Sequence, residues 1–281
     1  MAGTLFVVAT PIGHLEDITL RALRVLREAD VVAAEDTRRT ARLLTHHGIA
    51  TPTLSFHEHN TRTRIPQLVA RLEAGERIAL VTDAGTPGIS DPGIELVRAC
   101  VERGIPVDPV PGASAPLTAA IASGFPLAPL TVFGFAPARA KDRKSWLQQV
   151  GEVDHTFTFF EAPHRILDTL ADLDRLFGER PIMLGRELTK VHQEFIHGSA
   201  SAIIGRMPEP KGEFTVVVGP KPASENTPVA VSDEDIAGEF GRTTESTAGS
   251  RRQAVVALAK KYGRSSRDVY AIIERAKKSG E

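Results

Sequence analysis

The stretch Ile78-Ala-Leu-Val-Thr82-Asp-Ala-Gly-Thr-Pro-Gly-Ile-Ser-Asp-Pro-Gly93 decides the fold. Its first five residues form an aliphatic run typical of a buried strand, and the eleven that follow include three glycines and two prolines. Loops at the carboxyl ends of parallel strands border the crevice where α/β proteins bind ligands, and glycine lets backbone amides approach closely. The stretch therefore predicts an α/β fold with a ligand loop after residue 82. A plain strand-to-helix connection with Pro92 in the first helical turn is the alternative, and the stretch alone leaves both open.

Outward from this stretch, short aliphatic runs alternate with helical patterns, which predicts an α/β domain with a mainly parallel sheet over residues 1–123. The expected strands of this domain are 5–9, 31–34, 78–82 and 107–110. After the Pro-rich stretch 124–129, a second α/β domain is expected over residues 124–219, with strands at 131–135, 156–160, 181–184 and 214–218. Residues 220–231 have the composition of a linker, and residues 232–281 form a third unit.

Two further loops stand at strand ends. Residues 10–13 read Thr-Pro-Ile-Gly after the first strand, and residues 111–115 read Pro-Gly-Ala-Ser-Ala before an Ala-rich helix. Ser114 could cap that helix or offer its hydroxyl to a ligand, and taken by itself it is read as a cap. Because the carboxyl ends of parallel strands meet at one edge of a sheet, we expect all three loops to converge on one site.

The C-terminal unit has the pattern of two helices joined by a short turn. Ser250 and Gln253 fit a capping box, Gly263 stands at a helix stop, and apolar residues then recur with helical spacing. We expect an apolar face buried between the helices at Val255, Leu258, Val269, Ile272 and Ile273. Residues 251–281 carry a net charge of +6 and residues 232–250 one of −4, which favours a basic face directed at a polyanion.

Composition limits the class of protein to which the chain can belong. The chain has 281 residues with 42% hydrophobic and 25% charged residues, which is ordinary for a soluble protein of about two domains. No apolar run approaches the ~20 residues that a membrane span needs, and no signal peptide opens the chain, so we expect a cytoplasmic protein without a membrane span. The net charge of −1 excludes only an overall attraction to nucleic acid. The single cysteine, Cys100, is expected in a helix core.

The absence of certain motifs narrows the chemistry. No G-x-G-x-x-G follows a strand and no P-loop motif is present, which disfavours nucleotide hydrolysis and dinucleotide binding. Four histidines lie between residues 46 and 59, but no zinc-type motif accompanies them, so no catalytic metal is expected.

Taken together, the motifs of this chain resemble those of the tetrapyrrole methylase superfamily. Within it, the chain is similar to the ribosomal RNA small-subunit methyltransferase I family, which 2′-O-methylates a cytidine of 16S rRNA. The resemblance covers residues 4 to 219 and, less specifically, the helical tail. His14 and Ala113 depart from the family pattern, where Asn and Pro are common. The matching motifs, in family order, lie at 10–13, 35–38, 83–87, 111–115, 161–165, 186–190 and 211–214.

The resemblance implies two α/β domains with S-adenosylmethionine bound in the cleft between them, and a homodimer. It also implies which residues line the donor pocket. From the first domain these are Pro11, Gly85, Thr86, Ile89, Ser114 and Ala115, and from the second they are Phe160, Glu161, Leu188 and Thr215. Without the resemblance, Phe160 and Leu188 are read as plain core residues.

Glu213 and Lys190 are the candidates to orient or deprotonate a ribose hydroxyl. A lysine serves as a base only if burial or neighbouring cations lower its pKa; for both residues a purely structural or RNA-contacting charge stays open. Arginine offers a planar fork of donors that suits phosphate, although for Arg39 an ordinary surface role stays open. The candidate RNA contacts, in 16S rRNA or the small ribosomal subunit, are Arg38, Arg39, Arg165, Arg186, Arg251, Arg252, Lys260, Lys261, Arg264 and Arg267.

Two other functions remain open on the sequence. One is a tetrapyrrole C-methyltransferase with the same cleft, which would have no use for a basic tail. The other is a non-enzymatic RNA-binding protein of the ribosome, in which the three loops are mere connections. Binding of S-adenosylmethionine separates the second from an enzyme.

Overall fold

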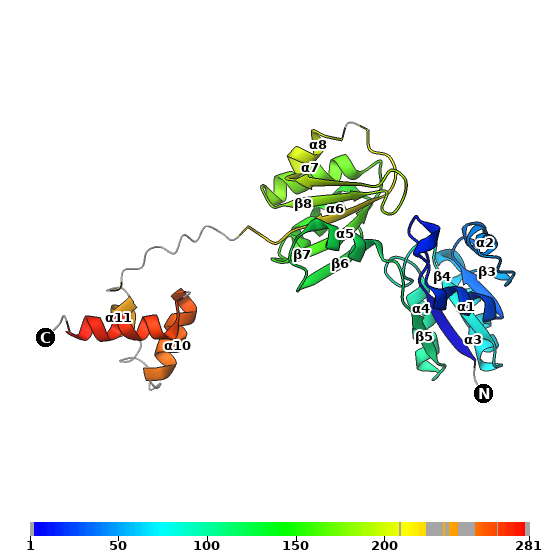
Figure 1. Cartoon of the computed structure of the whole chain (residues 1–281), viewed down its shortest axis with the longest axis horizontal. Coiled ribbons are helices and arrows are strands. Elements are labelled where there is room, and N and C mark those ends of the chain that lie inside the picture. The colour runs from blue at the N-terminus through cyan, green and yellow to red at the C-terminus, as the bar shows by residue number, and fades with distance from the viewer. Residues whose placement is uncertain are drawn as a thin grey trace. The chain divides into compact units, whose positions relative to one another are not determined.

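A computed structural model describes residues 3–207, 209–222, 233, 236–240, 251–262 and 264–278. For residues 252, 260, 261, 277 and 278 only the backbone is described. The chain divides into one unit from Met1 to Pro222 and another from Ala223 to Glu281, and each is described by itself (Figure 1). Among the described residues, no helix is both long and apolar enough to cross a membrane.

The first unit begins with a five-stranded, fully parallel sheet of order β3-β2-β4-β1-β5. Its strands are β1 (Thr4–Val8), β2 (Val31–Ala34), β3 (Thr53–Ser55), β4 (Arg77–Val81) and β5 (Val107–Val110). The connecting helices are η1 (Leu15–Asp17), α1 (Leu20–Glu28), α2 (Thr37–His46), η2 (Glu58–Asn60), α3 (Thr61–Glu73) and α4 (Gly93–Glu102).

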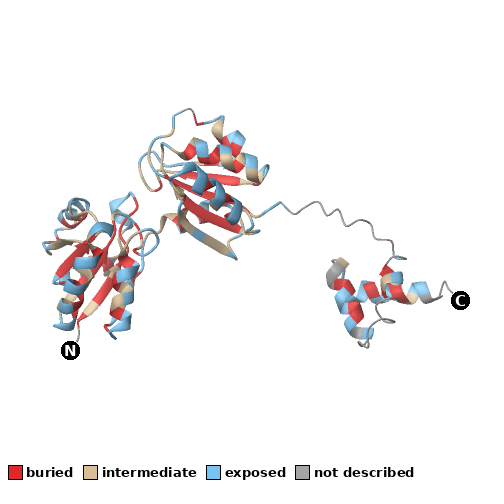
Figure 2. Ribbon diagram, turned by 180° about the vertical axis from the view of Figure 1, so that it is seen from behind, coloured by how far each residue is buried: buried red, intermediate tan, exposed pale blue. Residues whose placement is uncertain are grey.

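Both faces of this sheet are covered, as an all-parallel sheet requires. Successive residues of β1 point to opposite faces, so Leu5 packs with α3 and α4 while Phe6 packs with α1. All four residues of β2 are buried, in keeping with its unbroken apolar sequence. Figure 2 shows buried strands, in red, in the part of the molecule that carries the N-terminus. Cys100 is fully buried on α4, and burial raises the pKa of its thiol to about 11. The prediction of a core cysteine is confirmed.

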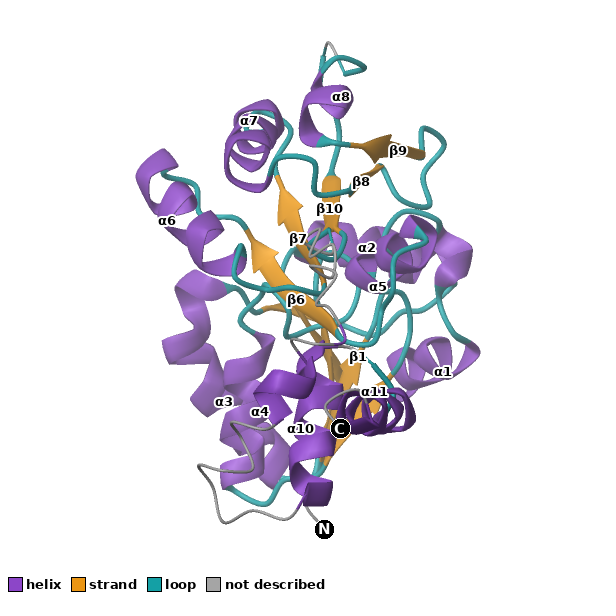
Figure 3. Ribbon diagram, turned by 90° about the vertical axis from the view of Figure 1, so that its left-hand side faces the viewer, coloured by secondary structure: helices purple, strands orange, loops and turns teal. Residues whose placement is uncertain are grey.

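A second five-stranded sheet, of order β6-β7-β10-β8-β9, completes the first unit. Only β6 and β7 are parallel; the other neighbours run antiparallel. Its strands are β6 (Leu130–Phe135), β7 (Thr156–Glu161), β8 (Ile182–Arg186), β9 (Glu194–Gly198) and β10 (Phe214–Val218). The accompanying helices are α5 (Ala115–Ser123), α6 (Ala140–Val150), α7 (Ile166–Phe177) and α8 (Ala200–Ile204). Figure 3 shows α6 and α7 beside strands β6 and β7.

Helix α5 joins the two halves of this unit. It follows β5 of the first sheet, yet Ala119 packs with Met183 and Val217 of the second sheet. Helices α6, α7 and α8 share the core on the other face. The expected domain boundary at residue 123 stays a prediction, and the packing groups α5 with the second sheet.

The C-terminal unit contains α10 (Arg251–Tyr262) and α11 (Ser266–Lys278), the two helices that the sequence predicts. Their apolar faces pack together with Ile236 and Phe240. The five residues expected between the helices are all buried, with at most 7% exposure. Ser250, Gly263 and most of the expected linker lie outside the described residues.

The α/β class and all eight expected strands are confirmed, each within one or two residues of its observed ends. Two strands, β3 and β9, were not predicted from the sequence. β3 has only three residues, and β9 is an edge strand whose sequence, Glu-Phe-Ile-His-Gly, mixes polar and apolar residues.

Candidate active site

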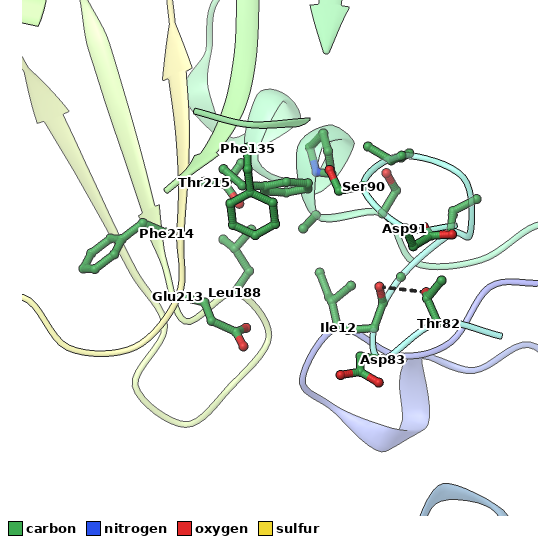
Figure 4. A pocket seen from close by; sticks show the side chains of 18 of the residues that line it. Ile12, Thr82, Asp83, Ser90, Asp91, Phe135, Leu188, Glu213, Phe214 and Thr215 are labelled. Atoms are coloured by element: carbon green, nitrogen blue, oxygen red, sulfur yellow. Dashed lines mark hydrogen bonds between the residues drawn. The ribbon is translucent and has the colours of Figure 1, made fainter. Parts of the chain in front are cut away.

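A cavity of about 410 Å³ lies where loops of the first sheet face the ends of β6, β7 and β10. Figure 4 shows Ile12, Asp83 and Ser90 on one side and Leu188 and Thr215 on the other. The lining residues are Ile12, Glu35, Arg39, Thr82, Asp83, Ala84, Gly85, Thr86, Ile89, Ser90, Asp91, Ser114, Ala115, Pro116, Phe135, Phe160, Glu161, Ala162, Pro163, Leu188, Glu213, Phe214 and Thr215.

The three strand-end loops of the first sheet meet at this cavity through hydrogen bonds. The Thr10 amide donates to the Gly85 carbonyl (2.9 Å), and the Gly85 amide donates to the Thr10 carbonyl (3.0 Å). Thr86 Oγ1 donates to the carbonyl of Ala113 in the third loop (3.1 Å). The expected convergence is confirmed.

Gly85 lines the cavity in a backbone conformation that favours glycine. Its φ of +82° lies in the left-handed region, and a Cβ here would meet the Ile12 side chain at 3.3 Å. A larger residue would be strained and would narrow the cavity.

Asp91 fixes the loop between β4 and α4. Its carboxylate accepts hydrogen bonds from the amides of Gly88 (2.7 Å) and Gly93 (2.8 Å), one on each oxygen. Gly88 has a φ of +99°. The residues that line the cavity from this loop, such as Ile89, are therefore held by a side chain inside the same loop.

A pair of carboxylates joins the ends of the neighbouring strands β2 and β4. The Asp83 amide donates to Glu35 Oε2 (3.3 Å), and the Asp36 amide donates to Asp83 Oδ1 (2.9 Å). Arg39 of α2 pairs with the other oxygen of Asp83 at 3.4 Å. Burial, the largest influence, raises the pKa of Glu35; the charges of Asp83 and Asp91 add to this, and the Asp83 amide and Arg39 only partly oppose it.

Glu161, at the end of β7, is 2% exposed and held on both oxygens. One accepts from the Ala162 amide (2.7 Å) and lies 2.6 Å from Nη2 of Arg165, and the other accepts from Thr169 Oγ1 (2.6 Å). The Arg165 side chain is 14% exposed. These contacts fix Ala162, which lines the cavity. They also engage Arg165 in an ion pair, although the sequence suggested this arginine for phosphate binding.

Residues 187–190 form a strained loop that carries Leu188 into the cavity. Glu187 and Thr189 have φ values of +49° and +62°, which non-glycine residues rarely adopt. The Lys190 ammonium donates to Glu187 Oε1 (3.0 Å) and to Glu213 Oε2 (2.9 Å). The His14 amide donates to Thr189 Oγ1 (3.0 Å) and so ties the loop to the first sheet's half of the unit.

These contacts decide the protonation of Lys190. Burial lowers the pKa of its ammonium, but the hydrogen bonds and charges of Glu213 and Glu187 outweigh burial, and the net pKa is raised. The condition under which Lys190 would serve as a base is not met. Lys190 is held as a cation between two carboxylates.

A smaller cavity of about 160 Å³ adjoins the first and shares Ile12, Arg39, Ala84 and Glu213 with it. Lys190 and Pro11 line this second cavity. Nine of the ten residues expected to bind the donor line the larger cavity, and Pro11 is the exception. Ser114 makes no capping hydrogen bond at the start of α5, contrary to its reading as a cap.

The arginines suggested for RNA differ in their engagement. Arg38 is exposed at the start of α2, whereas Arg186 donates to the Lys211 carbonyl (2.8 Å) and pairs with Glu194 (3.3 Å). In the C-terminal unit Arg251 pairs with Glu274 (2.9 Å) and Arg264 with Asp233 (3.0 Å).

Arg267 is exposed on α11. The side chains of Arg252, Lys260 and Lys261 lie outside the described residues.

Sequence reasoning did not select Ile12, Glu35, Asp83, Asp91 and Phe135 for the site, although they line the cavity. For Glu35 and Asp83 a signal existed, because each directly follows a strand of the parallel sheet. In the part of the chain that the structure describes, no group of three or more His, Cys, Asp or Glu residues is placed to hold a metal ion.

Residues 4–204 match the model of the family Tetrapyrrole (Corrin/Porphyrin) Methylases. A protein of Synechocystis sp. named Ribosomal RNA small subunit methyltransferase I is 44% identical over 96% of this chain and 97% of its own. One of the same name from Halalkalibacterium halodurans is 48% identical over 77% of this chain and 75% of its own.

A Thermotoga maritima protein of that name is 47% identical over 221 residues, which are 78% of this chain and 99% of its own. About a fifth of the present chain thus has no counterpart in it.

Solved structures establish the likeness of fold alone. A uroporphyrin-III C-methyl transferase from Thermus thermophilus complexed with S-adenyl homocysteine is 20% identical, with a TM-score of 0.55 over 77% of this chain and 97% of that one. A diphthine synthase structure is 14% identical, with a TM-score of 0.59 over 78% of this chain and 90% of that one.

Proposed function

The chain belongs to the tetrapyrrole methylase family, among the proteins named ribosomal RNA small subunit methyltransferase I, and from that premise we propose its reaction. It transfers a methyl group from S-adenosylmethionine to the ribose 2′-hydroxyl of a cytidine in 16S rRNA. The observation that carries the proposal is the cavity at the strand-end loops, together with similarity to such proteins over 96% of the chain.

The cavity fits this donor in size and chemistry. Its volume of about 410 Å³ lies in the range of ligand pockets, ~300–1,000 Å³. Five carboxylates and one arginine line it, which suits a cationic sulfonium. Because Gly85 has no Cβ, its backbone can contact a bound molecule directly; a Cβ there would instead approach the Ile12 side chain.

Each side of the cavity has a task in this reaction. S-adenosylmethionine, when bound, supplies a methyl group on an activated leaving group. Gly85, Thr86 and Ser114 contribute backbone and hydroxyl groups that hold a polar ligand, while Ile12, Phe160 and Leu188 cover it and exclude water. Orientation and exclusion of water are large contributions where the leaving group is already activated.

The RNA contacts are revised by the geometry. We propose Arg38 as a phosphate contact because it is exposed. Arg39 lines both cavities but pairs with Asp83 at 3.4 Å, which makes it the weaker candidate. Arg165 is committed to the buried Glu161. In the C-terminal unit the exposed Arg267 is a better candidate than the paired Arg251 and Arg264.

We propose that the protein acts in the cytoplasm as a homodimer. Support for an interface comes from exposed apolar side chains, since Leu117 and Ile121 lie one turn apart on α5 and are 51% and 72% exposed. Sedimentation of the wild type against Ile121→Glu tests this.

One experiment tests the central proposal. The protein is incubated with labelled S-adenosylmethionine and either naked 16S rRNA or 30S subunits, and the methylated nucleotide is mapped. A single 2′-O-methylcytidine is expected. Donor binding without RNA methylation would favour a small-molecule methyltransferase, and absence of donor binding would favour a non-enzymatic RNA-binding protein.

A further inference from the structure

Five carboxylates line the cavity, and they differ in how fully their oxygens are engaged by other protein groups. Glu161 is paired with Arg165 and holds Thr169, and Asp91 uses both oxygens on backbone amides of its own loop. Asp83 binds the Asp36 amide with one oxygen and pairs with Arg39 through the other. These three carboxylates are committed to holding the protein together.

Two carboxylates remain. Glu213 forms an ion pair with Lys190 at 2.9 Å, and this pair holds the loop that carries Leu188. Glu35 receives one hydrogen bond, from the Asp83 amide to Oε2. Within the described residues no cation lies within 4.0 Å of Glu35, and its Oε1 accepts no hydrogen bond. Glu35 is therefore the carboxylate of this cavity that is neither charge-paired nor fully hydrogen-bonded.

The position of Glu35 suits work on a bound hydroxyl. It directly follows β2, at the carboxyl edge of the parallel sheet, beside the loop that carries Gly85 and Thr86. The bond from Asp83 fixes one oxygen and leaves the other available in the cavity. The strand that it follows is fully buried, which anchors the backbone on one side of Glu35.

We propose that Glu35 orients the acceptor ribose hydroxyl through Oε1 and takes its proton during methyl transfer. This inference rests on the proposed function. As the hydroxyl oxygen bonds to the methyl carbon, the carbon–sulfur bond breaks and its electron pair stays on sulfur, which becomes a neutral thioether. The hydroxyl proton passes to Glu35 and is later released to water.

Electrostatics support this role. The charged groups that face Glu35 are Asp83 after β4, Asp91 before α4 and Arg39 on α2. Burial and the two aspartates raise the pKa of Glu35, which makes its carboxylate a stronger proton acceptor than an ordinary glutamate. Lys190, held as a cation, lacks this capacity.

The test is the pH dependence of single-turnover methylation of 16S rRNA by wild type, Glu35→Gln, Glu213→Gln and a control, Glu73→Gln. Glu73 is a half-exposed residue of α3 that faces Arg103. We expect Glu35→Gln to lower the rate by ~10²–10⁴-fold, as loss of a general base does. It should also abolish the fall in rate at acid pH, while donor binding stays measurable by calorimetry.

A readout independent of activity comes from NMR titration of carboxyl-¹³C glutamate in the free protein, with Glu35→Gln identifying the signal. A Glu35 titration midpoint above the ordinary 4.5 is expected. A midpoint at or below 4.5, a near-normal rate in Glu35→Gln, or loss of the acid limb in Glu213→Gln alone would overturn the inference. A wild type that binds no donor or methylates no 16S rRNA would instead overturn the proposed function.

Discussion

At the scale of single residues, Thr86 gives the most direct test of the donor cavity. It is half-buried in the loop after β4, and its hydroxyl donates to the Ala113 carbonyl. We expect Thr86→Arg to fold but to lose measurable affinity for S-adenosylmethionine, because a long cation would fill the cavity and oppose a cationic ligand. Calorimetry measures the affinity, and circular dichroism checks the fold.

Thr86→Ser is the matched control, since it keeps the hydroxyl and its hydrogen bond. Its donor affinity should stay close to that of the wild type. If Thr86→Arg folds and binds the donor normally, this loop is not part of the donor site.

Arg180 gives a test of stability far from the chemistry. It is 2% exposed, donates to the carbonyls of Gly219 (2.7 Å) and His155 (2.9 Å), and lies over the rings of Phe157 and Phe177. Arg180→Met leaves two carbonyls without their donor, at ~1–3 kcal/mol each. We expect the free energy of unfolding to fall by about 2–5 kcal/mol in urea titration.

Arg175→Met serves as its control, because that side chain is 59% exposed in its pair with Asp172. Exposed pairs contribute ~0–1 kcal/mol. Equal losses in the two variants would contradict the structural role given to Arg180.

At the scale of elements, the loop at residues 187–190 is expected to depend on Lys190. Its ammonium holds Glu187 in a left-handed conformation and thereby places Leu188 in the cavity. We expect Lys190→Met to weaken donor binding by about tenfold, or ~1.4 kcal/mol, because charge-assisted hydrogen bonds are lost at a partly exposed site. Lys211→Met is the control, since Lys211 pairs with Glu209 on the surface.

The pH dependence of the stability that Lys190 and Glu187 contribute follows from the shifts of their two pKa values. For Glu187 burial opposes ionisation, but the hydrogen bonds from Lys190 and the Glu213 amide dominate and lower its pKa. Its stabilisation is complete above the ordinary 4.5 and is lost as pH falls through the lowered pKa. That of Lys190 is complete below 10.5 and is lost as pH rises through its raised pKa.

The difference in unfolding free energy between wild type and Lys190→Met should therefore be constant between about pH 5 and 10. A difference that changes steadily across that interval would show that another group controls the loop.

Elements also mark how far sequence analysis reaches. Buried strands such as β2 can be predicted because both of their faces are covered and their sequences are therefore apolar throughout. The glycine-rich loops could be assigned to one edge of the sheet because parallel strands all end there. Glu35 does follow an expected strand directly, but it stands beside Asp36, Arg38 and Arg39, so its position alone does not separate it from these charged neighbours. Only strand order brings the end of β2 next to that of β4.

The pairing of arginines was similarly beyond sequence analysis. Arg165 and Glu161 are four residues apart, but the sequence does not reveal that the carboxylate is buried at the end of β7. Pairs between distant segments, such as Arg264 with Asp233, depend on how the helices of the C-terminal unit pack.

At the scale of the whole molecule, the two units are expected to divide the work. The cavity proposed to bind the donor and the five described carboxylates that line it belong to residues 1–222. The Thermotoga maritima relative is matched over 99% of its length by 221 residues of this chain. A protein of that name therefore exists at about the size of the first unit, and we expect the C-terminal unit to contribute RNA affinity rather than chemistry.

Deleting residues 232–281 should accordingly leave S-adenosylmethionine affinity and the single-turnover rate at saturating RNA near their wild-type values, but weaken RNA binding. If z cations of the tail neutralise phosphates, log affinity falls with log salt by about 0.7z for single-stranded RNA, and the truncated protein should have the shallower slope. Arg267→Ala should reduce the slope on its own, and Arg264→Ala should do so less, because Arg264 is paired with Asp233. Sedimentation run in parallel separates RNA binding from assembly: an unchanged slope with loss of a dimer would assign the tail to dimerisation instead.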